Sequence, residues 1–383
     1  MKLLEGLKSE VFNDRKALHL IPEPGFEEHK TATYIMSQLD ALGISYERTG
    51  QTGIVAWIHG VAPTKTLAFR TDMDGLSVNE ESDYPEHSVH PSFMHACGHD
   101  GHMAMMLGLA RLLARPEVKV IDNIVMIFQP AEEGPGGAQV LVEEGLIERH
   151  KIDEIYGIHV FPAVMEGKVG LCPGPMMAMT GEFDIDIQAK SAHGAMPHTG
   201  TDGIVIASDV VTKLQSIVSR NINPIKPAVL TIGRMEAGER RNVIAGKARL
   251  EGTIRAFDKE VFYQLKSRIA EMLVGIEASY GVKIEVVFRD MYPPVVNDQR
   301  LFNEFITHHI DECVVIEPQM ISEDFSYYQE RIPGLFYFIG TYNEEKGYVY
   351  PLHNSRFNFD DSILMHGLRT YYNILIYKDS IQI

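Results

Sequence analysis

Hydrophobic and polar positions repeat along the chain with two different periods, and the period predicts the elements. Apolar residues recur at helical spacing over residues 3–20 and 28–42, and the turn Pro22-Glu23-Pro24-Gly25 separates these two predicted helices. Short apolar runs then alternate with helical patterns, which is typical of an α/β sheet. The predicted strands lie at 53–59, 66–69, 123–128 and 155–158, with a helix at 101–114.

From about residue 179 the pattern becomes that of a half-exposed sheet. Phe183, Ile185 and Ile187 alternate with polar residues, as in a strand with one buried face. The predicted elements of this segment are a helix at 202–220, strands at 228–234 and 247–257, a helix at 259–279 and a strand at 282–288. The order β-α-β-β-α-β is that of the split ferredoxin-like motif.

The α/β pattern returns near residue 290, with a helix at 299–312, a strand at 335–340 and a helix at 361–376. The sequence therefore predicts an α/β fold of two domains. The first, at 1–178 and 290–383, is a discontinuous α/β domain with a mixed sheet. The second, at 179–289, is an inserted ferredoxin-like α+β domain that acts as a lid, a dimerisation domain or both.

Composition changes this picture only through the partners that it excludes. The chain has 383 residues and a formal net charge of -17, which argues against nucleic acid or an anionic membrane, since both need a basic face. No window approaches the ~18 apolar residues of a membrane span, and charged residues interrupt the N-terminal segment too early for a signal peptide. The 3 cysteines make no disulfide framework, so we expect a reducing, cytoplasmic compartment.

Candidate chemistry gathers where the predicted strands end. Asp72, Glu132, Glu133 and His159 each follow an apolar strand, and ligands of α/β sheets bind beyond the carboxyl ends of the strands. Each residue alone also has a structural explanation, as a surface acid, a turn cap or a core histidine. Their shared position predicts one site. In it Glu133 binds metal and Glu132 handles a proton, because two adjacent carboxylates do not easily reach one ion from the same direction.

A thiol and an imidazole lie two residues apart in His95-Ala96-Cys97-Gly98-His99-Asp100, so both project from the same side of an extended segment. The segment leads into a helix N-terminus, whose dipole we expect to lower the pKa of the Cys97 thiol. With His159, His353 and Glu133, Cys97 and His99 make a set of ligands large enough for two divalent metal ions per chain that share a bridging group and a water. Thiolate and imidazole suit zinc, and manganese, nickel and cobalt are alternatives.

Several phrases, in order along essentially the whole chain, resemble the metal-dependent aminoacylase/carboxypeptidase amidohydrolases. The branch is that of hippurate hydrolases, auxin-conjugate hydrolases and bacterial N-acetyl-amino-acid deacetylases. The phrases are Arg70-Thr71-Asp72-Met73-Asp74, Met94-His95-Ala96-Cys97-Gly98-His99-Asp100, Phe128-Gln129-Pro130-Ala131-Glu132-Glu133, Gly157-Ile158-His159-Val160, Ser191-Ala192-His193-Gly194, Asn242-Val243-Ile244, Glu251-Gly252-Thr253-Ile254-Arg255 and Ser322-Glu323-Asp324-Phe325.

The resemblance implies a role for each candidate residue. The two-metal centre would be formed, with the thiolate as bridge, by Cys97, His99, Glu133, His159 and His353. Glu132 would be the general acid/base, and Asp72 would orient a ligand. His193 would polarise the scissile carbonyl or stabilise the oxyanion, and Asn242 and Arg255 would bind the carboxylate end of the substrate. The family also implies a homodimer that pairs through the smaller domain, so that His193 serves its own or its partner's site.

The implied reaction is hydrolysis of the linear amide of an N-acyl amino acid, above all an N-acetyl amino acid, that keeps its free carboxylate. Within the family the activity that we expect first is that of an N-acetyl-diaminopimelate deacetylase, in lysine biosynthesis. The alternatives are a broader N-acyl-amino-acid amidohydrolase of the hippurate or N-acetyl-cysteine type, and a dipeptidase or carboxypeptidase. From other classes, a non-catalytic metal-binding or small-molecule-binding protein and a structural dimer stay open.

Overall fold

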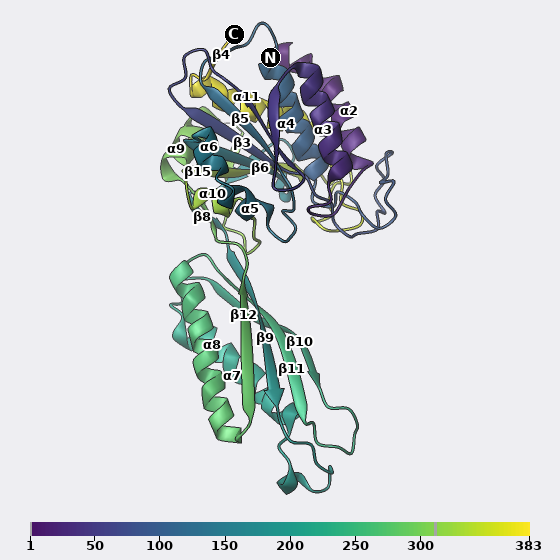
Figure 1. The fold of residues 1–383 in the computed structure, drawn as a ribbon, viewed down its shortest axis with the longest axis vertical. Coiled ribbons are helices and arrows are strands. Elements are labelled where there is room, and N and C mark those ends of the chain that lie inside the picture. The colour runs from purple at the N-terminus through teal and green to yellow at the C-terminus, as the bar shows by residue number, and fades with distance from the viewer. Residues whose placement is uncertain (1, 310–311) are drawn as a thin grey trace. The chain divides into compact units, whose positions relative to one another are not determined.

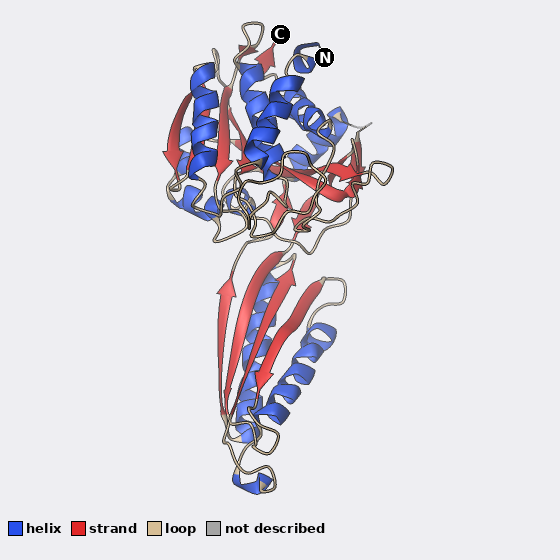
Figure 2. Cartoon of the chain, turned by 90° about the vertical axis from the view of Figure 1, so that its right-hand side faces the viewer, coloured by secondary structure: helices blue, strands red, loops and turns tan. Residues whose placement is uncertain are grey.

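A computed structural model describes residues 2–309 and 312–383 of the chain. The chain divides into two compact units (Figure 1). Unit 1 comprises Met1–Gly174, Val296–Glu317 and Asp324–Ile383, and unit 2 comprises Pro175–Val295 and Pro318–Glu323. Both units contain helices and strands (Figure 2). The chain passes between them within two short strands, β8 (Gly174–Met177) and β13 (Val295–Asn297), and again at each end of Pro318–Glu323.

Unit 1 is built on a mixed sheet, and the predicted α/β fold class with its mixed sheet is confirmed. Its central neighbours pair parallel, and antiparallel pairs flank them. Within the described residues its eight strands lie in the order β1 (Ser45–Thr49), β2 (Gly53–Ile58), β5 (Asn123–Gln129), β3 (Thr66–Asp72), β6 (Glu154–Met165), β15 (Gly334–Tyr342), β7 (Val169–Leu171) and β14 (Cys313–Val315). A separate antiparallel pair is formed by β4 (Lys119–Val120) and β16 (Ile381–Gln382).

One hydrophobic core joins this sheet to most of the helices of unit 1. The helices that contribute to it are α1 (Lys2–Glu5), α2 (Lys8–His19), α3 (His29–Leu42), α4 (His99–Leu113), α9 (Gln299–His308) and α11 (Ile363–Tyr377). Helix α4 is buried almost all round, so it lies inside the unit with its N-terminus at the strand ends. Three short helices complete the unit: α5 (Gly137–Glu143), α6 (Leu146–His150) and α10 (Ser326–Gln329).

The carboxyl ends of three neighbouring strands meet at one edge of the sheet. Asp72, the last residue of β3, is paired with Gln129, the last residue of β5. Strand β6 follows β3 only as far as Gly157 and then continues along β15 alone. His159 lies two residues beyond this point, where β6 no longer has β3 beside it. The strand was expected to stop at residue 158, and pairing with β15 is the reason that it runs on to Met165.

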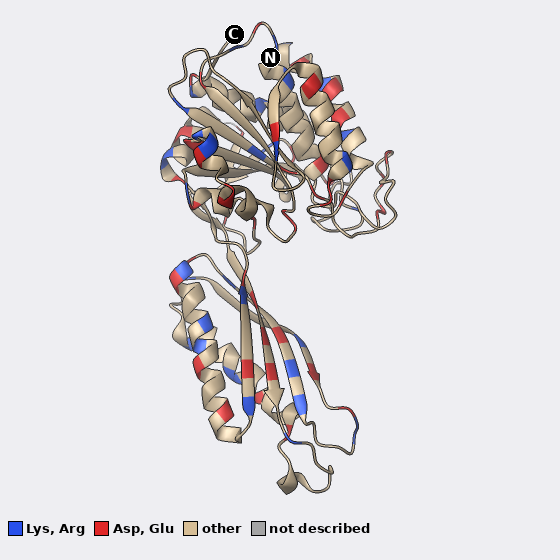
Figure 3. Cartoon of the chain, viewed as in Figure 1, with Lys and Arg blue, Asp and Glu red and all other residues tan. Residues whose placement is uncertain are grey.

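Unit 2 is an antiparallel sheet with two helices. Its strands lie in the order β10 (Ala228–Ala237), β11 (Lys247–Ala256), β9 (Met179–Gln188) and β12 (Lys283–Asp290), and its main helices are α7 (Gly203–Asn221) and α8 (Lys259–Tyr280), with a short 3-10 helix at Pro197–Thr199. Alternate residues of β9 are buried in the core that this sheet shares with α7 and α8. The residues between them carry charges, and acidic and basic side chains follow the strands (Figure 3).

Two of the predicted elements differ from the structure in instructive ways. The helix expected at 3–20 is interrupted, because α1 ends at Glu5 and α2 begins at Lys8, with the chain turning between them. Of the helix expected at 299–312, α9 ends at His308, and residues 310 and 311 lie outside the described part of the chain. The short strands β1, β7 and β14 carry too few residues to show a period in the sequence.

Among the residues that the structure describes, no helix combines the length and the hydropathy that crossing a bilayer requires.

Candidate metal centre

The site begins with His99, the first residue of α4. Its Nδ1 lies 2.9 Å from the backbone oxygen of Asp74 and, as the donor of this hydrogen bond, leaves Nε2 as the atom that faces the site. Nε2 is buried and has no hydrogen-bond partner. It lies 3.7 Å from Asp72 Oδ2 and 3.9 Å from Glu132 Oε2. A buried nitrogen that faces two carboxylates is well placed to bind a cation.

Gly98 allows the two neighbouring ligand candidates to fit against the sheet. Its φ of 82° lies in the left-handed region, and a Cβ there would come within 2.4 Å of Val160 Cγ2 on β6. Any larger residue between Cys97 and His99 would push this loop away from the strand.

A second set of ligand atoms surrounds the Cys97 thiol. Its Sγ lies 3.4 Å from His159 Nε2 and 3.4 Å from His353 Nε2. His353 Nε2 in turn lies 3.1 Å from Glu133 Oε1. His353 comes from a distant loop, and its backbone N–H donates to Ala96 O at 2.9 Å, which holds it beside Cys97. Its φ of 65° is unusual for a residue other than glycine.

These atoms form two groups that share one residue, within which all ligand atoms lie within 4.8 Å of one another. One group is Cys97, Glu133 and His353, the other is His99, Glu132 and Glu133, and His159 belongs to a further group with Asp72, His99 and His102. The donor set of thiol, imidazole and carboxylate is one that binds divalent transition metals. The residues present therefore fit the pair of metal ions expected from the sequence. All five ligand candidates lie in unit 1, and the structure brings them together.

Charge in the site favours a bound cation as well. Burial lowers the pKa of His99, but Asp72 and Asp74 outweigh this effect and raise the pKa to about 10. Burial, with Glu133 and Glu132, raises the pKa of the Cys97 thiol well above its usual value. The expected lowering by the helix dipole is thus wrong, because Cys97 is buried among carboxylates. A metal ion bound by these two candidate ligands would have to displace their protons, so its binding would weaken as the pH falls.

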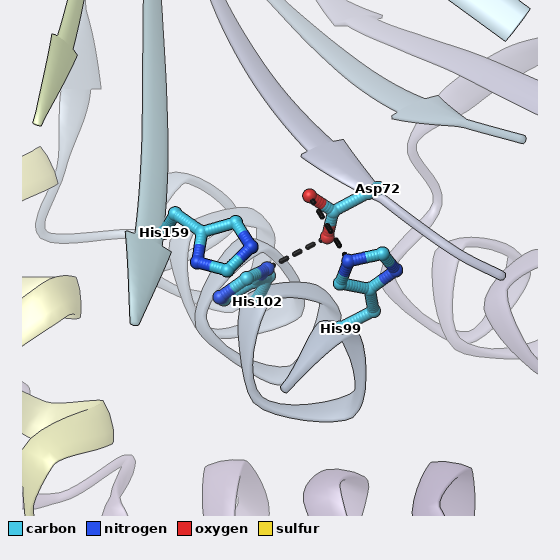
Figure 4. A group of neighbouring side chains, drawn as sticks. All are labelled: Asp72, His99, His102 and His159. Carbon is cyan, nitrogen blue, oxygen red and sulfur yellow. Dashed lines mark hydrogen bonds and ion pairs between the residues drawn. The ribbon is translucent and has the colours of Figure 1, made fainter. Parts of the chain in front are cut away.

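Asp72 is held by Arg70 and by His102, and Figure 4 shows its carboxylate facing His102 and His99. Arg70 Nη1 donates to its Oδ2 at 3.0 Å, and His102 Nδ1 lies 2.7 Å from its Oδ1. The same guanidinium binds Asp324 Oδ1 at 2.8 Å and Gln129 Oε1 at 2.8 Å, and all of these side chains are fully buried. A buried charge pair of this kind is costly to break, because removing one partner leaves the other unpaired.

Sequence reasoning missed two residues of the site. Asp74 accepts the backbone N–H groups of Glu132 at 3.1 Å and Glu133 at 3.0 Å, and so fixes the turn that carries both carboxylates. His102 binds Asp72 from α4. Signals for both were present: Asp74 is in the same motif as Asp72, and His102 lies three residues after His99 and hence on the same helix face.

The residues expected to contact substrate lie in unit 2, and the structure groups only two of them. His193 and Asn242 are exposed and adjacent, since Val243 pairs with His193 and Gly194 N donates to Asn242 O at 2.8 Å. Arg255 lies near the other end of β11. Strand β11 begins at Lys247, five residues after Asn242. From Lys247 to Arg255 there are eight residue steps of ~3.3 Å each, so the strand between these two residues is about 26 Å long. One Arg255 N–H group donates to Met320 O at 3.0 Å.

Comparison with known proteins shows which family this chain belongs to. The model of the peptidase family M20/M25/M40 matches residues 68–377, which is most of the chain. The chain belongs to this family. The resemblance to metal-dependent amidohydrolases and the prediction of a hydrolase acting on amides are confirmed. An N-acetyldiaminopimelate deacetylase of Exiguobacterium sibiricum is 40% identical over 93% of this chain and 98% of its own length. One of Anoxybacillus flavithermus is 41% identical over 90% and 91%.

Solved M20-type structures share the fold as well. An aminohydrolase from methicillin-resistant Staphylococcus aureus matches with a TM-score of 0.91 and 32% identity, over 99% of this chain and 98% of that chain. A Bacillus subtilis protein described as a dinuclear metal-binding peptidase of the M20 family matches with a TM-score of 0.83 and 30% identity, over 98% and 99%.

Proposed function

We propose that this M20 chain is an N-acetyldiaminopimelate deacetylase of lysine biosynthesis, which hydrolyses the amide of an N-acetyl amino acid that keeps its free carboxylate. The observation that carries the proposal is the pair of ligand groups that share Glu133, with the Glu132 carboxylate 3.9 Å from His99 Nε2. Such an arrangement suits hydrolysis assisted by two metal ions. The names of the curated relatives support the choice of substrate.

We assign the metal ligands as Cys97, His99, Glu133, His159 and His353, among which the Cys97 thiolate would be the ligand shared by the two ions. Two divalent ions bound by them, zinc in our assignment, would lower the pKa of a shared water toward ~7. Burial lowers the pKa of His159 well below its usual value, so this imidazole is neutral and ready to bind metal. A Cys97→Ser variant should lose at least one ion by metal analysis, whereas full occupancy with normal activity would exclude Cys97 as a ligand.

Glu132 is the general acid/base in this proposal. It takes a proton from the attacking water and returns it to the leaving nitrogen, as a carboxylate near the reacting atoms can. His193 donates to the carbonyl oxygen as negative charge develops there. Asp72 holds its position beside His99 through its bonds to Arg70 and His102.

Unit 2 raises the question of how the substrate is held. An N-acetyl amino acid is much shorter than the about 26 Å of β11 that separates Lys247, just after the loop of Asn242, from Arg255. If both residues bind one substrate, one of them must come from a second copy of the chain. This supports a homodimer that pairs through residues 179–289, in which His193 and Asn242 act in the partner's site. The lid and dimerisation roles of this segment, like the cytoplasmic location, stay predictions.

Mixing two inactive variants tests whether His193 acts in the site of the partner subunit. If His193 acts across subunits, heterodimers re-formed from Glu132→Gln and His193→Ala chains should regain activity in one of their two sites. If it acts within its own chain, every site keeps one defect and the mixture stays inactive. A monomer in solution, measured by light scattering, would contradict the dimer itself.

The substrate is tested by amine release from a panel of N-acyl amino acids, after loading with zinc, manganese, nickel or cobalt. We expect N-acetyl-diaminopimelate to be turned over best. An amidated substrate should be poor, because its free carboxylate is missing. Faster hydrolysis of hippurate or N-acetyl-cysteine would favour the broader amidohydrolase, and hydrolysis of dipeptides would favour the peptidase alternative. Absence of turnover in a metal-loaded protein would favour the non-catalytic binding protein.

A further inference from the structure

One histidine of the site has the place of a metal ligand but not the free nitrogen that a ligand needs. His102 lies fully buried on α4 beside Asp72, His99 and His159, and the four side chains point toward one another (Figure 4). Its ring centroid is 4.5 Å from that of His159 and 5.5 Å from that of His99. Spacing alone would allow it to bind a metal ion.

The hydrogen bonds of His102 assign its protons. The backbone N–H of Val160 can only donate, and it points at His102 Nε2 at 2.8 Å. Nε2 is therefore the acceptor, and the ring proton is on Nδ1, which donates to Asp72 Oδ1 at 2.7 Å. Both nitrogens are used within the protein, so neither has a lone pair left for a metal ion.

The same residue, Val160, also orients His159. The carbonyl of Val160 accepts a hydrogen bond from His159 Nδ1 at 2.6 Å, which leaves His159 Nε2 directed at Cys97 Sγ. A continuous chain of hydrogen bonds thus runs from Asp72 through His102 to Val160 and on to His159. It links the carboxylate beside His99 on one side of the site with the imidazole beside Cys97 on the other.

We propose that His102 is a positioning residue, a non-ligating histidine that sets the spacing between the two ligand groups by joining Asp72 on β3 to His159 on β6. The inference rests on the metal centre of the proposed function. Because a change in spacing would shift His159 Nε2 and the Asp72 carboxylate beside His99, loss of His102 should weaken metal binding without removing a ligand. Outer hydrogen-bond partners of metal ligands typically contribute ~10–100-fold in affinity.

The wild-type chain tests the first half of the proposal without any substitution. Protein labelled with ¹⁵N-histidine is loaded with ¹¹³Cd²⁺ alone, and scalar coupling between cadmium and ring nitrogen is measured by NMR. Coupling is expected at His99, His159 and His353, and the His102 resonances should show a protonated Nδ1 and no coupling. Coupling at His102 would overturn the proposal. A chain that binds no cadmium or zinc would overturn the proposed function and this inference together.

Two variants test the positioning role. His102→Leu removes both hydrogen bonds at similar volume, and His102→Asn keeps a donor near the position of Nδ1. We expect both to bind two ions, with affinity for zinc in competition with a chelator lowered ~10–100-fold in His102→Leu and partly restored in His102→Asn. The visible spectrum of the Co²⁺-loaded protein should change in step. His309→Gln, at another buried histidine that bonds a backbone carbonyl, is the matched control and should leave affinity and spectrum unchanged.

The outcomes separate this proposal from a merely structural role. Unchanged affinity and spectrum in His102→Leu, with a less stable metal-free protein, would make His102 a packing residue and overturn the inference. Loss of one whole ion would make it a ligand and overturn it as well. Neither result would affect the proposed hydrolysis, which depends on the five ligands and Glu132.

Discussion

The two units carry candidate functional residues in opposite ways. In unit 1 the ligand candidates are mostly buried. A hydrogen bond to the backbone oxygen of Asp74 fixes His99, and hydrogen bonds from His102 and Arg70 fix Asp72 beside it. In unit 2 His193 and Asn242 are exposed on loops. A metal centre needs ligands preset in one geometry, whereas a group that contacts substrate can remain open to solvent until the substrate is bound. The difference predicts distinct phenotypes for substitutions in the two units.

The largest effect is expected within unit 1, at the Glu132–Glu133 pair. Glu132→Gln should keep both metal ions but lower turnover ~10²–10⁴-fold, because the proton carrier is lost. Glu133→Gln should instead weaken metal binding, because its carboxylate belongs to both ligand groups. Metal analysis and steady-state kinetics on the two variants measure the contrast. Reversed phenotypes would show that the roles within the pair are exchanged.

In unit 2 His193→Ala should lower turnover ~10²–10³-fold, as expected for loss of one donor to a developing oxyanion. Metal content and the free energy of unfolding should stay those of the wild type, because the side chain is exposed. His198→Ala, a nearby exposed histidine, is the control and should be fully active. Turnover in His193→Ala close to that of the wild type would remove this residue from the reaction.

Asp74 allows a further test of the preset geometry in unit 1, because it holds the turn of Glu132 and Glu133 and is not a ligand in our assignment. Asp74→Asn replaces one of the two oxygens that accept from Glu132 and Glu133, so the metal affinity should fall ~10–100-fold. The control is Asp153→Asn, because Asp153 accepts a backbone N–H at the opposite end of β3 and should leave affinity unchanged. Equal effects of both substitutions, in a chelator competition assay, would point to general destabilisation.

The smallest effect on activity is expected from substitution of His19, which contacts Asp100 in the first turn of α4. Its Nδ1 lies 2.8 Å from Asp100 and its Nε2 2.9 Å from Glu80. Burial lowers the pKa of His19, but Asp100 and Glu80 outweigh this and raise it to about 9. Because the folded-state pKa is above the ordinary histidine value of 6.5, the stabilisation is complete below that pH and is lost as the pH rises through about 9.

Urea unfolding of the metal-free protein measures this contribution. We expect His19→Gln to unfold more easily by about 3 kcal/mol near pH 6, which follows from the size of the pKa shift. The difference should vanish above pH ~9, where the wild-type histidine is neutral too. His87→Gln, at an exposed histidine, should behave as the wild type at both pH values. A difference that does not depend on pH would attribute the loss to packing.

Much of this protein could be read from its sequence because the information is local. A period of two or of about 3.6 residues predicts strands and helices directly, and apolar runs that end in Asp72, Glu132 and His159 placed these residues at the strand ends. The phrase around Cys97 and His99 carried the family resemblance. What these observations share is that the deciding residues are close together in the chain.

Only the tertiary structure decided how distant residues meet. It brought His353 to within 3.4 Å of Cys97, 256 residues earlier, and placed Val160 N–H on His102. It also showed that burial, with Glu133 and Glu132 nearby, raises the pKa of the Cys97 thiol, and that Arg255 lies near the end of β11 remote from the loop of Asn242. Such facts depend on strand order, burial and direction of hydrogen bonds, which no local pattern encodes, because each arises from packing between segments far apart in sequence.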